Sequence, residues 1–172
     1  TYGTLRNLLV RQPGRIRILA GKLIAMKIFA LVMIAISAVV SIGISYFLSD
    51  RAKVSTDLWF TSDGFQEIGK TLLNVAISVV YFGIVGMILG LLLRSPISAI
   101  SIGVLWILII ENLLGAVKPV FLDWMPGNQL SLIAQGGSAE ISYMHALTLG
   151  TSYVFVGAIV ETVLFTRRDV AN

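Results

Sequence analysis

Long apolar runs with few polar interruptions dominate the chain and predict its secondary structure. Four of these runs are long enough to cross a bilayer, at residues 23–48, 72–93, 97–116 and 146–165. At about 1.5 Å of rise per residue, a helix over the shortest run extends roughly 30 Å, the thickness of the hydrocarbon core. The runs lack the period-two alternation of barrel strands. The pattern therefore predicts an all-α fold, a polytopic membrane helix bundle with four transmembrane helices.

Residues 1–22 precede the first apolar run and form a basic, amphipathic pattern. Leu5, Leu8 and Leu9 recur at the i, i+3, i+4 spacing that places them on one helical face, before a proline-glycine break at residues 13–14. The cations of this segment, which no acidic residue offsets, are Arg6, Arg11, Arg15, Arg17 and Lys22. We expect the segment to lie along the membrane surface or against a partner.

The composition makes lipid the expected solvent of the chain. Apolar residues make up 56% of the 172 residues and charged residues only 13%, against about 25% charged residues in a soluble protein. We therefore expect a single transmembrane domain over residues 1–172. The chain holds no cysteine, so it has neither a disulfide framework nor a thiolate metal site. Because it begins with Thr1 and shows no signal peptide, we interpret it as the C-terminal part of a longer protein.

The distribution of Lys and Arg predicts the orientation of the spans. The net charge of +4 is concentrated beside apolar runs, which is typical of topology-setting charge and not of nucleic-acid binding. One side would carry Arg6, Arg11, Arg15, Arg17, Lys22, Lys27, Arg94, Arg167 and Arg168. The other side would carry Arg51, Lys53, Lys70 and Lys118. This asymmetry predicts a multi-pass protein of the cytoplasmic membrane with both ends of this sequence in the cytoplasm.

The outer loop between the last two runs, at residues 117–143, is unusually apolar. Its apolar pieces at 120–122, 124–126 and 130–134 are separated by Pro-Gly and Gly-Gly pairs and are too short to cross a bilayer. We expect a broken re-entrant loop, with short interfacial or re-entrant helices buried against the bundle.

Polar side chains within or beside the runs are the candidates for a substrate path. Serines four residues apart share one face of the first run and can line a path, but packing with hydroxyls bonded to the preceding turn is favoured. Ionisable groups in a membrane default to a functional hypothesis, with structural pairing as an equal alternative here. The candidate path residues are Ser37, Ser41, Asn74, Glu111 and Asn112.

One match to a catalytic motif is interpreted as coincidence. Residues 64–71 satisfy the phosphate-loop pattern G-x-x-x-x-G-K-[ST], but polar residues precede them where a buried strand is needed, and an apolar run follows. His145 is the only histidine, which excludes a histidine cluster within this chain. We find no triad order, paired carboxylates or metal-ligand spacing, so we expect no catalytic residue, cofactor or metal in this chain.

Several short motifs, taken in order, carry a resemblance. They are Gly3-Thr4-Leu5-Arg6, then Pro13, Arg15 and Gly21-Lys22, then Arg94-Ser95, the broken outer loop, and Phe165-x-x-Arg168-Asp169. Together they resemble the permease subunit of a type-2 ABC (ATP-binding-cassette) exporter of the bacterial drug, antibiotic or lipid efflux kind. Because that family has six spans, the resemblance implies two further N-terminal spans outside this sequence.

The resemblance also implies a mechanism and partners. The N-terminal helix would be a coupling helix that docks on separate cytoplasmic ABC ATPase subunits, which would hold ATP and Mg. Its contact residues would be Thr4, Leu5, Arg6, Leu8, Leu9 and Arg11. A second permease, in a homo- or heterodimer, and membrane lipids would be further partners, and a hydrophobic or amphipathic molecule would be exported. The alternative is a non-transporting assembly or sensor subunit of a larger membrane complex.

Overall fold

The computed structural model describes residues 15–167, whose regular elements are all helices. The elements are α2 (Arg15–Ala52), α3 (Ser62–Leu93), α4 (Pro96–Leu105), η1 (Trp106–Ile110), α5 (Glu111–Val117), η2 (Pro119–Trp124), α6 (Pro126–Gln135) and α7 (Tyr143–Arg167). Four segments are long and apolar enough to cross a membrane: Ala20–Ala52, Ser62–Leu93, Pro96–Val117 and Tyr143–Val160. The predicted all-helical fold with four long apolar helices is confirmed, which indicates a multi-pass membrane protein.

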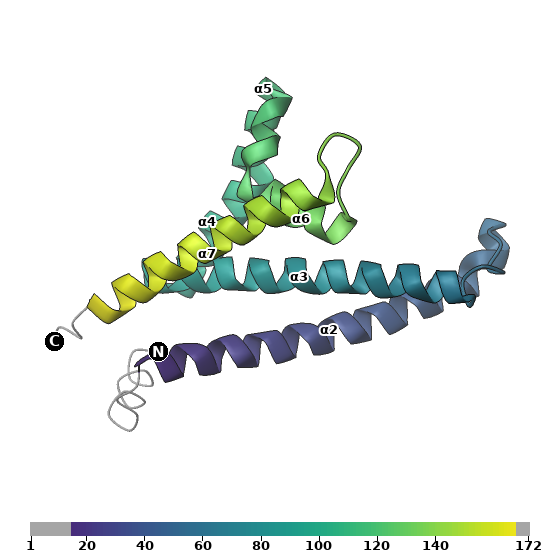
Figure 1. The fold of residues 1–172 in the computed structure, drawn as a ribbon, viewed down its shortest axis with the longest axis horizontal. Coiled ribbons are helices and arrows are strands. Elements are labelled where there is room, and N and C mark those ends of the chain that lie inside the picture. Colours follow the sequence, from purple (N-terminus) through teal and green to yellow (C-terminus); the bar gives the residue numbers. More distant parts are fainter. Residues whose placement is uncertain (1–14, 168–172) are drawn as a thin grey trace.

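Helices α2 and α3 form a long antiparallel hairpin that runs the length of the molecule (Figure 1). Helix α2 begins at Arg15 and includes the end of the segment expected to lie flat, and α3 begins at Ser62, well ahead of its apolar run. The Thr61 hydroxyl caps α3 by accepting the Gly64 N–H at 3.2 Å. Residues 64–71 are therefore helical, and the phosphate-loop match has no loop that could cradle a phosphate.

The third span leaves the hairpin through a tight link. Arg94 ends α3 in the left-handed conformation (φ 55°), and the Ser95 hydroxyl caps α4 by accepting the Ser98 N–H at 3.3 Å. The segments α4, η1 and α5 then follow one another as a column that rises away from α2 and α3 (Figure 1). The middle of this column, η1, is a π-helix and not a continuation of the α-helix.

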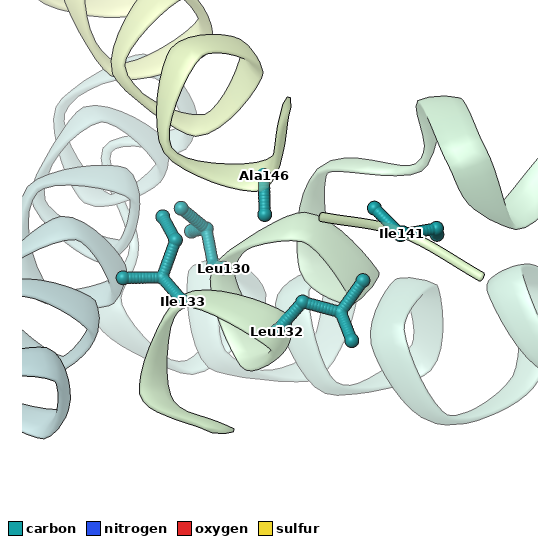
Figure 2. Packing of buried hydrophobic residues seen from close by; sticks show 5 residues of the cluster. All are labelled: Leu130, Leu132, Ile133, Ile141 and Ala146. Atoms are coloured by element: carbon teal, nitrogen blue, oxygen red, sulfur yellow. The ribbon is translucent and has the colours of Figure 1, made fainter. Parts of the chain in front are cut away.

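The buried core forms around α6, one of the shortest helices. This helix of 10 residues lies between α3 and α7. Figure 2 shows its apolar side chains pointing toward the start of α7 and the loop before it. The core residues are Leu130, Leu132, Ile133, Ile141 and Ala146. The part of the chain that is too short to span a membrane is thus the best buried.

Two glycines turn the chain from α6 back into α7. Gly136 and Gly137 have φ of 80° and 98°, a backbone region that other residues rarely adopt. Their N–H groups bond the carbonyls of Ile133 (3.2 Å) and Leu132 (2.9 Å), which closes the C-terminus of α6. The reversal allows α7 to pack along α6.

A matched pair of glycine substitutions tests the packing of α6 on α7. A Cβ at Gly150 would lie 2.8 Å from Ile133 Cδ1 and 3.0 Å from Leu130 Cδ2, whereas a Cβ at Gly86 would meet nothing within 4 Å. We expect Gly150→Ala to destabilise the protein by about 1–3 kcal/mol, because overpacking forces buried side chains to shift. The measurement is the free energy of unfolding in detergent micelles. Gly86→Ala should leave it unchanged or higher, and equal effects of the two changes would contradict the packing.

Candidate functional site

A buried carboxyl group lies where the third span meets the outer loop. Glu111, at the start of α5, is only 3% exposed. Its Oε1 accepts hydrogen bonds from Trp106 Nε1 (2.7 Å) and the Gly127 N–H (2.8 Å). Its Oε2 accepts one from the Asn128 N–H (2.7 Å). Both oxygens of the carboxyl group therefore act as hydrogen-bond acceptors.

The π-helix brings Trp106 and Glu111 together. Residues five apart point to different faces of an α-helix, but the wider π turn stacks them. The backbone shows this turn directly, because the Glu111 N–H bonds the Trp106 carbonyl five residues earlier. The indole and the carboxyl group of the same two residues then meet at 2.7 Å.

Glu111 acts as the missing N-cap of α6. Met125 occupies the cap position of that helix and offers no side-chain hydrogen bond. The first N–H groups of a helix have no internal partner and carry the positive end of the helix dipole. Glu111 supplies acceptors to two of them from a separate helix. We call Trp106, Glu111, Gly127, Asn128 and Gln129 the Glu111 junction.

Gly127 leaves the space that this contact needs. A Cβ at Gly127 would lie 2.8 Å from Glu111 Oε2, 2.9 Å from Oε1 and 2.9 Å from Ile107 Cγ1. Any larger residue would therefore push the carboxyl group away from the helix start. The glycine is required here for close approach.

The amide side chains of the junction hold the end of η2. Asn128 Nδ2 donates to the Leu122 carbonyl at 2.9 Å, and Gln129 Nε2 donates to the carbonyls of Leu122 (3.0 Å) and Asp123 (2.9 Å). Gln129 is fully buried, and its Oε1 has no hydrogen-bond partner within the described residues. The first turn of α6 thus donates main-chain hydrogen bonds to Glu111 and side-chain hydrogen bonds to the carbonyls of η2.

Helix α7 binds the same end of η2 from the other side. Tyr153 donates its hydroxyl to the Trp124 carbonyl at 2.8 Å, and His145 Nε2 lies 3.3 Å from the Asp123 carbonyl oxygen. The His145 ring also meets the Trp124 ring edge-on, at 6.2 Å between centroids. The third span, the outer loop and the last span are therefore joined by polar contacts to main-chain groups.

The candidate path residues lie in separate places. Ser37 and Ser41 are exposed on α2, and Asn74 lies on α3 beside the C-terminus of α6, where its Nδ2 is 3.5 Å from the position of a Cβ on Gly136. Asn112 is exposed and donates from Nδ2 to two carbonyls of its own helix, those of Ile107 and Leu108, both at 3.1 Å. Only Glu111 belongs to the junction.

The expected contacts with an ATPase fall outside the described residues. The proposed ATPase contacts Thr4, Leu5, Arg6, Leu8, Leu9 and Arg11 lie before residue 15, where the described part of the chain begins. Between residues 15 and 167, no three His, Cys, Asp or Glu side chains come together in a way that could hold a metal ion.

Sequence reasoning missed most of the junction. Trp106, Gly127, Asn128 and Gln129 were not candidates, because a five-residue spacing is not an α-helical signal and their partners are distant in sequence. One usable signal was present. The start of α6 at Pro126 follows Met125, which cannot cap a helix, so a cap from elsewhere in the chain was needed.

A family model described as "Protein of unknown function (DUF2705)" matches residues 1–171. No curated protein and no solved structure matches the chain. The family match shows that the resemblance to type-2 ABC exporter permeases was wrong, since a different family covers the whole of that resemblance. Its motifs were short and used residue types that are common at the ends of membrane helices, so their order was weak evidence.

The carboxyl group of Glu111 can be tested by removing one of its two acceptors. In Glu111→Gln, an amide nitrogen replaces one oxygen and faces an N–H donor, so at least one bond to α6 is lost. Hydrogen bonds to charged groups contribute about 1.5–3 kcal/mol, which corresponds to exchange faster by roughly tenfold or more. We expect this change in hydrogen–deuterium exchange of residues 126–135, measured by mass spectrometry.

The control for this experiment is Glu67→Gln. Glu67 is an exposed carboxylate paired with Lys70 at 2.7 Å, far along the chain from α6. Its substitution should leave the exchange of residues 126–135 unchanged. If Glu111→Gln also leaves it unchanged, Glu111 does not hold the start of α6.

The space at Gly127 provides an independent test of the same contact. We expect Gly127→Ala to destabilise the protein by about 2 kcal/mol, because the added Cβ displaces the carboxyl group, and to lower the melting temperature by roughly 4–8 °C for a chain of this size. The measurement is thermal unfolding in detergent. The matched control is Gly69→Ala in α3, where a Cβ would meet nothing within 4 Å. Equal melting temperatures for the two variants would contradict the role of Gly127.

Proposed function

The chain belongs to the DUF2705 family, and we propose that it is a membrane-embedded subunit of a larger complex, with a structural and not an enzymatic role. The observation that carries the proposal is the third span. Its column α4–η1–α5 rises away from the α2–α3 hairpin instead of completing a closed bundle (Figure 1). A helix in this position is available to pack against helices of other chains.

All three parts of the third span contact other helices of the chain. Helix α4 packs against α3, while η1 and α5 contact η2 and α6. Other apolar side chains of the same segments are uncovered, with Ile100 66% exposed, Leu108 64% and Leu113 64%. Lipid can cover such side chains, because lipid tails are as apolar as leucine. The separation of the column from the hairpin supports a protein neighbour in addition to lipid.

The polar groups of the described spans support a structural role. Glu111 and the amide nitrogens of Asn128 and Gln129 bind main-chain groups, and Ser78 donates its hydroxyl to the Leu130 carbonyl at 2.7 Å. Tyr81 and Thr151 pair their hydroxyls at 2.9 Å between α3 and α7. Groups occupied in this way fix helix positions, whereas catalysis needs side chains that converge on a substrate.

The position of α6 supports a re-entrant loop. Asn74, Ser78 and Tyr81 mark the part of α3 that lies beside α6, and these residues belong to the apolar run of that helix. A short helix at this depth needs partners for its terminal N–H and carbonyl groups. Glu111 and the two glycines after α6 provide them. The loop would thus enter the membrane and return on the same side.

Photo-crosslinking in native membranes tests the proposed complex. We expect a photoreactive phenylalanine analogue at Leu108 or Ile100 to yield a discrete protein adduct, because these side chains would face a neighbouring subunit. The matched control is the same analogue at Ile88, which is 8% exposed and packs toward Gly157 inside the chain. Mass spectrometry of the adduct identifies the partner, and an adduct of two copies identifies a second copy of this chain.

The absence of a protein adduct would contradict the proposed complex. If Leu108 and Ile100 yield only lipid adducts while the control behaves as expected, the third span faces lipid alone. The proposal of a larger complex built on this column is then wrong.

A further inference from the structure

The turn end of the α2–α3 hairpin holds a cavity of about 430 Å³, which lies between the two helices and the loop that joins them. We propose that this cavity is a binding site for one acyl chain of a membrane phospholipid. Its lining residues are Ser41, Ile42, Ser45, Leu58, Trp59, Gly64 and Ile68. The size and the mainly apolar lining, with a few polar groups, fit those of small-molecule sites.

The cavity lies where the apolar runs of the two helices are offset from one another. Gly83 faces the Met26 side chain, and the cavity brings Gly64 and Ile68 beside Ser45 and Ser41. In this register the apolar run of α3, residues 72–93, is displaced along the hairpin from that of α2, residues 23–48. The displacement of their centres is roughly nine residues, or about 14 Å. At the turn end, α2 is therefore still apolar where α3 has become polar.

This mismatch places the cavity at the boundary between acyl chains and headgroups. Aromatic side chains gather there, with Tyr46 and Phe60 at 5.6 Å, Phe60 and Phe65 at 6.1 Å, and Tyr46 and Trp59 at 6.5 Å between ring centroids. Tryptophan and tyrosine favour the membrane interface. When the middle of the bilayer is placed midway between the centres of the two apolar runs, the cavity lies at the membrane interface.

The surface of α2 leads from the membrane to the cavity. Val39 and Phe47, on either side of the lining serines, are 73% and 79% exposed. Apolar surface thus continues along α2 past the point where α3 turns polar, and an acyl chain can follow it without leaving an apolar environment.

The chemistry of the walls favours an acyl chain. The lining is mainly apolar, and the polar groups among its side chains are the hydroxyls of Ser41 and Ser45 and the indole N–H of Trp59. Lys70, the cation nearest in sequence to Ile68, is already paired with Glu67 at 2.7 Å. The cavity therefore selects an apolar chain and not an anionic group.

Gly64 keeps the floor of the cavity in place. A Cβ at this position would lie 2.6 Å from the Trp59 carbonyl oxygen. The loop carrying Leu58 and Trp59 can therefore pack directly on the first turn of α3. This close approach places Leu58 and Trp59 beside the groove between the two helices.

Photolabelling with a lipid probe tests the site. The chain is reconstituted in bilayers that contain phosphatidylcholine with a diazirine in its acyl chain, then irradiated and mapped by mass spectrometry. We expect labels on Leu58, Trp59 and Ile68. Ser45→Phe fills the cavity and should lower these labels at least fivefold, and Ser37→Phe, on the same face of α2 but outside the lining, should leave them unchanged.

Two results would overturn the proposal. One is labelling of the lining residues no stronger than that of Val39 and unchanged in Ser45→Phe, which would mean ordinary contact with lipid. The other is an efficient disulfide dimer of Ser45→Cys, in a chain without native cysteine, which would place a second copy in the cavity. If Ser45→Phe fails to fold, as judged by circular dichroism, Ser41→Leu narrows the same space and decides between these outcomes.

Discussion

The structure depends on how a short helix can begin where other helices bury it. The first N–H groups of α6 would be left without partners in an apolar environment, where each unsatisfied group is costly. Glu111 resolves this by placing both carboxyl oxygens against the Gly127 and Asn128 N–H groups. With its start satisfied, α6 can lie between α3 and α7, where it forms most of the buried core. The packing of the described outer loop thus follows from one buried carboxyl group.

The rest of the packing follows the rules of helices in lipid. Association there depends on close approach and on hydrogen bonds between helices, because lipid covers apolar surface as well as protein does. Gly150 allows the apolar side chains of α6 to reach α7. Ser78 reaches the Leu130 carbonyl, and Tyr81 reaches Thr151. These contacts lie in the same region of the bundle, so the polar and steric restraints reinforce one another around α6.

The sequence allowed the four long helices and the short helices of the outer loop to be predicted, because length and apolar continuity are local properties. The Glu111 junction could not be predicted in this way. Trp106 meets Glu111 only through a π turn, and Glu111 meets Gly127 across 16 residues of sequence. The resemblance to exporter permeases failed for a related reason. Motifs of a few residues near span ends reflect the shared demands of the membrane interface, and those demands are common to unrelated families.

Some regions of the chain have paired polar groups, and others have uncovered apolar surface. This difference indicates where other molecules bind. Around Glu111 and Gln129 the polar nitrogens and carboxyl oxygens bind main-chain groups and hold three helices in place, which leaves that region little freedom to rearrange. The column carrying Leu108 and the hairpin end around Trp59 have apolar surface that the described chain does not cover. Helix α3 links these two surfaces, because it packs against α2 as well as against α4 and α6. The proposed partners, protein at the column and lipid at the hairpin end, would bind side chains carried by elements that are already folded, which lowers the conformational entropy lost on binding.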